Sequence, residues 1–295
     1  DFDVNAAMGE ENVGKIAAWL KEHIHKYGSS KDPAEILEHA CGALFDPRYY
    51  IDYLKDKCDY IFLPRIERAQ DRETCLNFRA QYDLVKNAFR DYNLNILFYN
   101  DMGHKEHKEE KAFKKLCKYL HIKKSIGKYA YKIAKQTQMY YEMFRSENQE
   151  NILKSTKKPK VLILAHAYNI GDKYIGEPII HMLEKLGVQP IIAEYFDHKK
   201  CVKESNKVTK TLPWSYNRQL VGALELYKDS VDGAVILTTY PCGPDSMCND
   251  MIVRDYKDIP LITLTIDAQD GSAGLETRLE SFTDILNYKR NNNNE

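Results

Sequence analysis

The chain has 295 residues, 43 Lys plus Arg against 43 Asp plus Glu, and 43% apolar residues. This length allows about two domains, and the ordinary apolar content excludes a disordered chain. Zero formal net charge argues against nucleic-acid or membrane-surface binding, which needs a field of one sign. No run reaches the ~18 apolar residues of a membrane span and no signal peptide is recognisable, so we expect a cytoplasmic protein without nucleic-acid or membrane partners.

Six short apolar runs predict buried strands, because consecutive apolar positions suit a parallel sheet covered on both faces. Helical patterns alternate with them, as in βαβ units. The sequence therefore predicts an α/β protein with two open parallel-sheet domains. The predicted strands are residues 59–64, 94–99, 160–165, 189–193, 233–239 and 261–266.

A helical segment separates the two groups of strands. Apolar residues recur at helical spacing from residue 113 to 120 and again from 126 to 144. Many lysines lie here, but glutamates are interleaved with them, which favours a solvated helix face over a nucleic-acid surface. The predicted organisation is an N-terminal α/β domain, a helical segment, a C-terminal α/β domain and a disordered tail, at residues 1–101, 102–158, 159–290 and 291–295.

Polar residues follow the predicted strand 160–165. His166 and Asn169 stand where the strand ends, and ligands of open α/β sheets bind outside the carboxyl ends of strands. They either line a ligand site or satisfy backbone groups of the loop. Neither a GxGxxG nor a GxxxxGK[ST] fingerprint is present, which makes a nucleotide-dependent transferase the least favoured function.

Cys242 lies in the most informative stretch, Thr-Tyr-Pro-Cys-Gly-Pro-Asp at residues 239–245. It follows a predicted buried strand, and the flanking Pro and Gly prevent regular structure and let the backbone approach closely. Such turns are common around thiolates that bind metals and iron–sulfur clusters. The sequence thus favours Cys242 as a ligand, with Asp245 beside it.

A similar arrangement follows the predicted strand 261–266. Asp267 stands at its carboxyl end, a glycine-containing loop comes next, and a helix carrying Arg278 begins near Gly274. The start of this helix either holds an anion or is an ordinary capped helix end. We predict that Asp267 and Arg278 shape a pocket of the second domain together with Asp245.

The other cysteines do not form a local metal motif. Cys58 and Cys117 are expected to be small core residues, and no CxxC pair occurs, which disfavours a zinc ribbon or a ferredoxin-type run. A site built from distant cysteines remains open. Seven cysteines spread over a chain of this size indicate reduced thiols or metal ligands rather than a disulfide scaffold.

Several of these stretches occur in the same order in one family. The chain resembles the 2-hydroxyacyl-CoA dehydratase and acyl-CoA dehydratase activase-related superfamily of anaerobic bacteria. The matching residues span roughly 35–286: the loop 166–170, residues 214–218, 239–246 and 265–280, and in the first domain Cys41, residues 55–66 and Cys75.

The resemblance implies two Rossmann-like (flavodoxin-like) domains with a cleft between them that holds a [4Fe-4S] cluster. Cys41, Cys75 and Cys242 correspond to its ligands, with His166 and Asn169 lining the cleft. The implied role is low-potential electron transfer or acyl-CoA dehydration. An ATP-dependent activase or a low-potential reductant is the implied partner, and an acyl-CoA the implied substrate.

The surroundings of two of these cysteines differ from the family pattern. Gly42-Ala-Leu follows Cys41, Leu76-Asn follows Cys75, and the family's opening strand is missing. We therefore expect a diverged or truncated N-terminal domain. The alternatives are a cluster-free relative acting as a binding or scaffold protein, and a zinc site of the three cysteines with a histidine.

Overall fold

The computed structural model of the chain describes residues 13–28, 30–44, 46, 48, 52, 57–69, 72–102, 109–266 and 272–292. The chain divides into two units, Asp1–Ile61 and Phe62–Glu295. Helices and parallel strands occur together, which confirms the predicted α/β class. The domain boundaries predicted at residues 101, 158 and 290 stay predictions.

The described part of the first unit is helical. Its helix α3 begins where the Asp32 carboxylate accepts a hydrogen bond from the Ala34 N–H at 2.8 Å, with Pro33 at the first helical position. It ends at Gly42, whose φ of 73° is in the left-handed region that favours glycine. The elements are α2 (Val13–His23), η1 (His25–Tyr27) and α3 (Pro33–Cys41).

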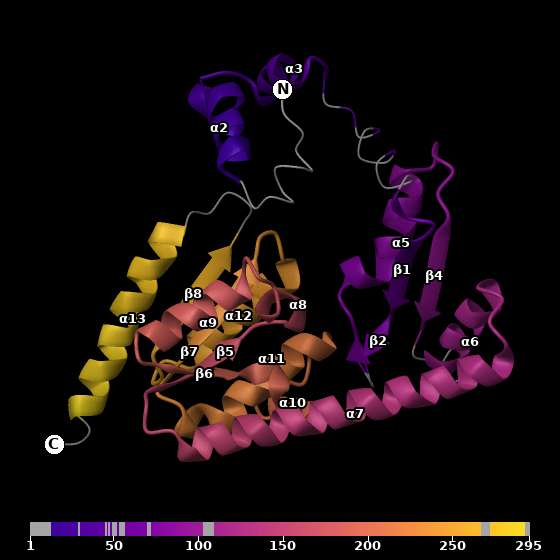
Figure 1. The fold of residues 1–295 in the computed structure, drawn as a ribbon. Helices are drawn as coiled ribbons and strands as arrows, with labels where there is room; N and C mark the ends of the chain where they lie inside the picture. Colours follow the sequence, from indigo (N-terminus) through magenta and orange to yellow (C-terminus); the bar gives the residue numbers. More distant parts are fainter. Residues whose placement is uncertain are drawn as a thin grey trace. The chain divides into compact units, whose positions relative to one another are not determined.

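The second unit is built around a four-stranded parallel sheet with strand order β6–β5–β7–β8 (Figure 1). In the register of the central strands, Leu162 is opposite both Ile191 and Ala234. The strands confirm the last four predicted from the sequence. They are β5 (Lys160–Leu164), β6 (Gln189–Ile192), β7 (Gly233–Thr239) and β8 (Leu261–Ile266).

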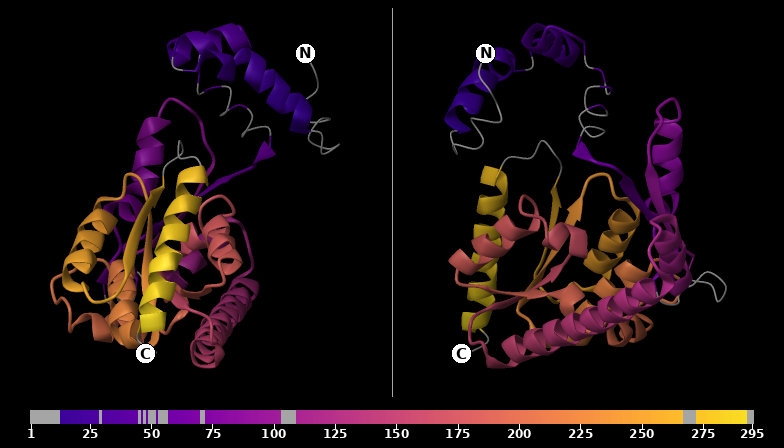
Figure 2. Two further views of the ribbon diagram at one scale, coloured as in Figure 1. Left: turned by 90° about the vertical axis from the view of Figure 1, so that its left-hand side faces the viewer. Right: turned by 45° about the vertical axis from the view of Figure 1, so that its right-hand side comes forward.

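Helices cover both faces of this sheet, as the two views of Figure 2 show. Side chains alternate along each strand, so Leu162 and Leu164 pack on one face while Val161 and Ile163 pack on the other. The first face carries α10 (His198–Ser205), α11 (Ser215–Tyr227) and α12 (Gly243–Asp255). The second carries α8 (Ala167–Ile170), α9 (Gly176–Lys185) and α13 (Ser272–Asn292).

The remaining strands of the second unit do not form a second open sheet in the part of the chain that the structure describes. β1 and β4 confirm the first two predicted strands, but they bond only to each other, and of the β1 residues only Leu63 is buried. Two Rossmann-like domains are therefore not confirmed. The elements are β1 (Ile61–Ile66), β2 (Arg68–Ala69), β3 (Arg72–Glu73), α5 (Leu76–Ala88) and β4 (Ile96–Asp101).

Both helices predicted in the connecting segment are present, as α6 (Glu109–Tyr119) and α7 (Lys124–Ser155). The end of α7 is fixed to the main sheet, because Gln149 Oε1 accepts a hydrogen bond from the Ile192 N–H at 2.6 Å and Leu153 joins the core. The predicted tail begins inside α13, which continues to Asn292. No described helix is both long and apolar enough to cross a membrane.

Candidate functional site

Polar side chains meet at the carboxyl ends of β5, β6 and β7. His166 follows β5, Glu194 follows β6, Thr238 is near the end of β7, Asn217 comes from α11 and Asp245 from the first turn of α12. We call these five residues the strand-end cluster. This edge of a parallel sheet is where open α/β proteins bind ligands, as the sequence predicted for His166.

Asp245 is the hydrogen-bonding centre of the strand-end cluster. Its Oδ1 accepts hydrogen bonds from His166 Nε2 at 2.7 Å and from Asn217 Nδ2 at 2.8 Å, and its Oδ2 accepts one from the Thr238 hydroxyl at 2.8 Å. All four side chains are buried. Asp245 therefore joins α12 to two strand ends and to α11.

The carboxylate of Asp245 is ionised at neutral pH. Burial raises the pKa of Asp245. The hydrogen bond and charge of His166, together with the hydrogen bonds of Asn217 and Thr238, outweigh burial and hold the pKa below its ordinary value. An ionised carboxylate can only accept hydrogen bonds, so Nε2 of His166 carries a proton. The arrangement fixes the orientation of the imidazole ring.

Aromatic rings from two helices pack on His166, and a ring from a third helix packs on those two. Tyr168 stacks on it with ring centroids 5.2 Å apart, and Tyr216 meets it edge-on at 6.2 Å. Phe78 of α5 contacts both tyrosines, at 5.8 and 6.3 Å. A backbone bridge between Glu73 and Trp214 joins the same regions. The N-terminal turn of α5 is thereby held beside the strand-end cluster.

This packing brings two of the three predicted ligand cysteines near each other. Cys75 is the N-cap residue of α5 and Cys242 that of α12. Both are partly exposed, both are free thiols, and they are close enough for the charge of Cys75 to affect Cys242. Both also act on Tyr168, whose pKa is raised mainly by burial and further by Asp245, Cys242 and Cys75.

The Cys242 thiol is expected to react slowly with iodoacetamide. Burial, together with the Asp245 carboxylate and Cys75, raises the pKa of Cys242 to about 11. At pH 8 the alkylation rate should be about 100-fold below that of an unperturbed thiol, and it should rise about tenfold per pH unit toward that pKa. Mass spectrometry of timed samples measures this, with the exposed Cys58 as comparison; equal rates at pH 8 would contradict it.

Sequence reasoning missed Glu194. Burial raises the pKa of Glu194, although the charges of His166 and Arg145 and the Ala167 N–H oppose that rise. A half-buried carboxyl with a raised pKa beside a histidine is a candidate functional group. Its position was a usable signal, because Glu194 follows its strand at the same edge of the sheet as His166 does.

The other predicted pocket residues lie in different environments. Asn169 is buried, and its Nδ2 has no hydrogen-bond partner among the described residues. Arg278 is exposed on α13 and donates a hydrogen bond to the Thr263 carbonyl, so the structure does not bring it to the strand-end cluster. Asp267 lies outside the described residues.

The other cysteines divide by burial. Cys117 is buried as predicted, whereas Cys58 is exposed, so its prediction as a core residue was wrong; β1 starts only at Ile61. Cys41 is the exposed last residue of α3 in the first unit. Among the described residues no three His, Cys, Asp or Glu side chains are arranged to hold a metal ion. The second unit offers the pair Cys75 and Cys242.

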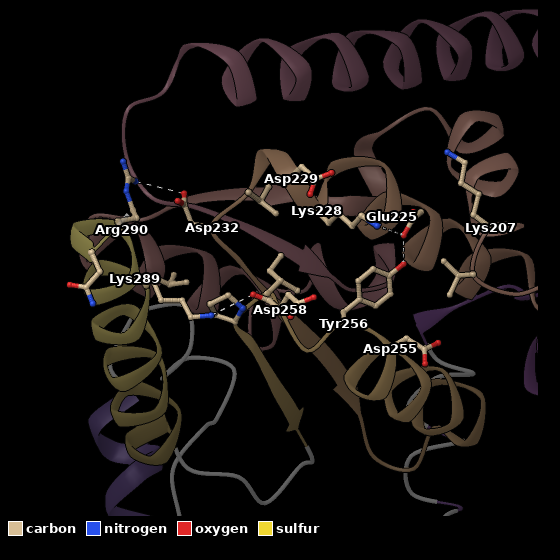
Figure 3. Close-up of a pocket in the computed structure, with 16 residues that line it drawn as sticks. Lys207, Glu225, Lys228, Asp229, Asp232, Asp255, Tyr256, Asp258, Lys289 and Arg290 are labelled. Atoms are coloured by element: carbon tan, nitrogen blue, oxygen red, sulfur yellow. Dashed lines mark hydrogen bonds and ion pairs between the residues drawn. The ribbon is translucent and has the colours of Figure 1, made fainter. Parts of the chain in front are cut away.

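A separate groove lies at the opposite end of the sheet (Figure 3). It has a volume of about 1060 Å³ and includes Asp232 and Pro260, which precede β7 and β8. Glu225, one of its charged residues, bonds to Lys228 at 3.1 Å and to the Tyr256 hydroxyl at 2.8 Å. The groove is therefore at the amino ends of the strands, away from the strand-end cluster, and we assign no function to it.

Residues 1–58 are similar to the Carboxypeptidase Taq (M32) metallopeptidase family. "Thermostable carboxypeptidase 1" of Pyrococcus furiosus is 39% identical over 57 residues, 19% of this chain and 11% of that protein. "Carboxypeptidase 1" of Bacillus subtilis is 36% identical over 63 residues, 21% of this chain and 12% of that protein. The chain thus spans only about a tenth of these relatives.

Residues 49–196 match the family described as "CoA enzyme activase uncharacterised domain (DUF2229)". The match covers half of the chain and includes Cys75, His166 and Glu194, whereas Cys41 and Cys242 lie outside it. It confirms a relation to the CoA-enzyme activase and dehydratase superfamily that the sequence resembles. The chain belongs to the DUF2229 family of CoA enzyme activase domains.

Proposed function

We propose that this protein is an iron–sulfur member of the CoA-enzyme activase-related proteins, with Cys75 and Cys242 as two ligands of a [4Fe-4S] cluster. It would act in low-potential electron transfer or in dehydration of an acyl-CoA, with an ATP-dependent activase or another low-potential reductant as its partner. The observation that carries the proposal is the position of these two free, partly exposed thiols, each at the N-terminus of a helix whose first turn contacts the strand-end cluster or the aromatic rings packed on it.

The donor chemistry of the pair suits such a group. Thiolates are the usual ligands of iron–sulfur clusters, and each of these cysteines stands at the N-terminus of a helix, where the dipole favours negative charge. Cys242 holds its proton in the free protein, so ligand binding at neutral pH would release that proton. A bound cluster would supply a one-electron couple or a Lewis-acidic iron.

A cluster needs at least one ligand beyond this pair. Cys117, Cys201 and Cys248 are buried in the apolar interior, and burial raises the pKa of Cys201 and of Cys248 to about 12. Inert core thiols of this kind are poor ligands. Cys41, exposed at the end of α3, is the ligand that the family resemblance supplies, and its participation is part of the proposal.

Anaerobic reconstitution with iron and sulfide tests the proposal. The loaded protein is expected to be brown, to absorb at about 400 nm as such clusters do, and to contain about four irons per chain. Cys75→Ser and Cys242→Ser should each lower the bound iron by at least half, whereas Cys58→Ser, which changes another exposed cysteine, should not. Cys41→Ser tests the third ligand in the same assay.

Two results would overturn the assignment. A colourless protein without iron after reconstitution would exclude the cluster, and equal iron in the Cys75→Ser, Cys242→Ser and Cys58→Ser variants would exclude the pair as its ligands. Zinc without colour, measured by metal analysis, would assign the same thiols to a structural zinc site.

A cluster-free relative that acts as a binding or scaffold protein is the second candidate. It is favoured by one observation: the described residues contain no group of three metal-binding side chains. The similarity of residues 1–58 to carboxypeptidases leads to no peptidase proposal, because the H-E-x-x-H zinc motif does not occur in the sequence.

A further inference from the structure

Helix α7 presents an apolar stripe to solvent. The stripe consists of Ile126, Tyr129, Ile133, Gln136, Tyr140 and Met143, and we call it the α7 seam. Its five apolar members are between 44% and 67% exposed. Contiguous apolar surface of this size is uncommon on a monomeric protein and marks interaction sites.

The rest of the protein uses a different face of the same helix. Gly127 lies against Cys117 of α6, Gln149 bonds to the edge strand β6, and Leu153 is in the core. At 100° per residue, these three positions lie on the side of the helix away from the α7 seam. The seam is therefore not needed to hold α7 in place.

The spacing of the α7 seam is that of a coiled coil. Its members are separated alternately by three and four residues, which gives the 3.5-residue period of a helix that packs against another helix. A solvated helix face has no need of this period. Gln136 is the single polar member of the seam.

The α7 seam is complementary to itself when two copies run antiparallel. One register places Ile126 opposite Met143 of a second copy and Tyr129 opposite Tyr140, and it pairs Ile133 with Gln136. Every seam position then faces another seam position, in an isologous contact about a two-fold axis. No residue from outside the helix is required to complete it.

The charges at the two ends of the α7 seam also favour antiparallel packing of two copies. Lys123 and Lys124 stand at the start of α7, and Glu147 continues the seam by one position at its other end. Antiparallel packing places the lysines of one copy beside Glu147 of the other. Parallel packing would instead align like charges, which is unfavourable.

The area available is close to that of a stable dimer. Half-exposed aromatic and long aliphatic side chains each have on the order of 100 Å² to bury. The seam, with the adjoining exposed Phe144 and Met139, offers roughly 600–700 Å² per copy, against about 800 Å² per partner in a standard interface. We propose that the α7 seam is the interface of a homodimer in which two α7 helices pack antiparallel.

Sedimentation equilibrium of the full chain tests this proposal. The wild-type protein is expected to be dimeric at roughly 50 μM, and Ile133→Lys and Tyr140→Lys should each weaken association by at least about tenfold. Tyr141→Lys is the matched control, since Tyr141 is as exposed as its neighbour but lies off the seam. Circular dichroism and urea unfolding should show all three variants folded.

A charge exchange tests the direction of packing. Lys123→Glu with Lys124→Glu should weaken the dimer, and adding Glu147→Lys should restore it, because only antiparallel helices bring these residues together. A wild-type monomer at this concentration, or a dimer that the seam variants leave unchanged, would overturn the proposal. Failure of the charge exchange to restore association would overturn the antiparallel register.

Discussion

Replacing Asp245 with alanine is expected to lower the free energy of unfolding by about 3–5 kcal/mol. Asp245 is only 4% exposed, and removal of its side chain leaves donors of His166, Asn217 and Thr238 buried without their acceptor. An unpaired buried donor keeps its full desolvation penalty. Urea unfolding followed by circular dichroism measures the loss.

Asp250→Ala is the control on the same helix. Asp250 forms an exposed ion pair with Arg254, and both side chains are 68% exposed, so its removal should cost less than about 1 kcal/mol. Equal losses for the two variants would contradict a special role of Asp245 in joining α12 to the sheet.

The stability that Asp245 contributes should depend on pH in a defined direction. Its pKa in the folded protein is below the ordinary 3.8, so ionised Asp245 stabilises the fold above the pH at which an unfolded aspartate titrates. That contribution is lost as the pH falls through the folded-state pKa. The difference in unfolding free energy between the wild type and Asp245→Asn should therefore narrow below about pH 4.

Strand positions were predicted best where both faces of the sheet are covered by helices. The apolar runs of β5 to β8 lie between two layers of helices, and their predicted positions are confirmed to within a residue. The runs that became β1 and β4 have similar residues, but most of their side chains are only half-buried. Apolar content alone could not distinguish fully buried from half-buried strands, because it gives no information on which elements pack against a strand.

The same limit applies to the site. His166 and Asp245 could be predicted to stand at strand ends, and the structure joins them by a 2.7 Å hydrogen bond. Asn217 and Tyr216 reach the cluster because α11 crosses the sheet with its first turn at that edge, and no sequence spacing gives that crossing. The proximity of Cys75 to Cys242 depends likewise on Phe78 packing against two tyrosines.

Gly222→Ala is expected to destabilise the protein by about 3 kcal/mol or more. Helices α10 and α11 cross so closely here that a Cβ atom on Gly222 would lie 1.7 Å from the carbonyl oxygen of Cys201. The obstacle is backbone, which cannot rotate away as a side chain can, and Val221 and Ala223 on either side are fully buried. The two helices must separate to accept one methyl group.

Because α11 also carries Asn217, movement of α11 away from α10 should disturb the strand-end cluster. Alkylation of Cys242 should therefore be faster in Gly222→Ala than in the wild type. Gly274→Ala on α13 is the control. A Cβ atom added there would have no other atom within 4 Å, so the variant should not lower the free energy of unfolding and could raise it by up to about 1 kcal/mol through helix propensity. Urea unfolding and timed alkylation of both variants give the comparison. If Gly222→Ala unfolds at the wild-type midpoint, the close crossing of α10 and α11 does not position the cluster.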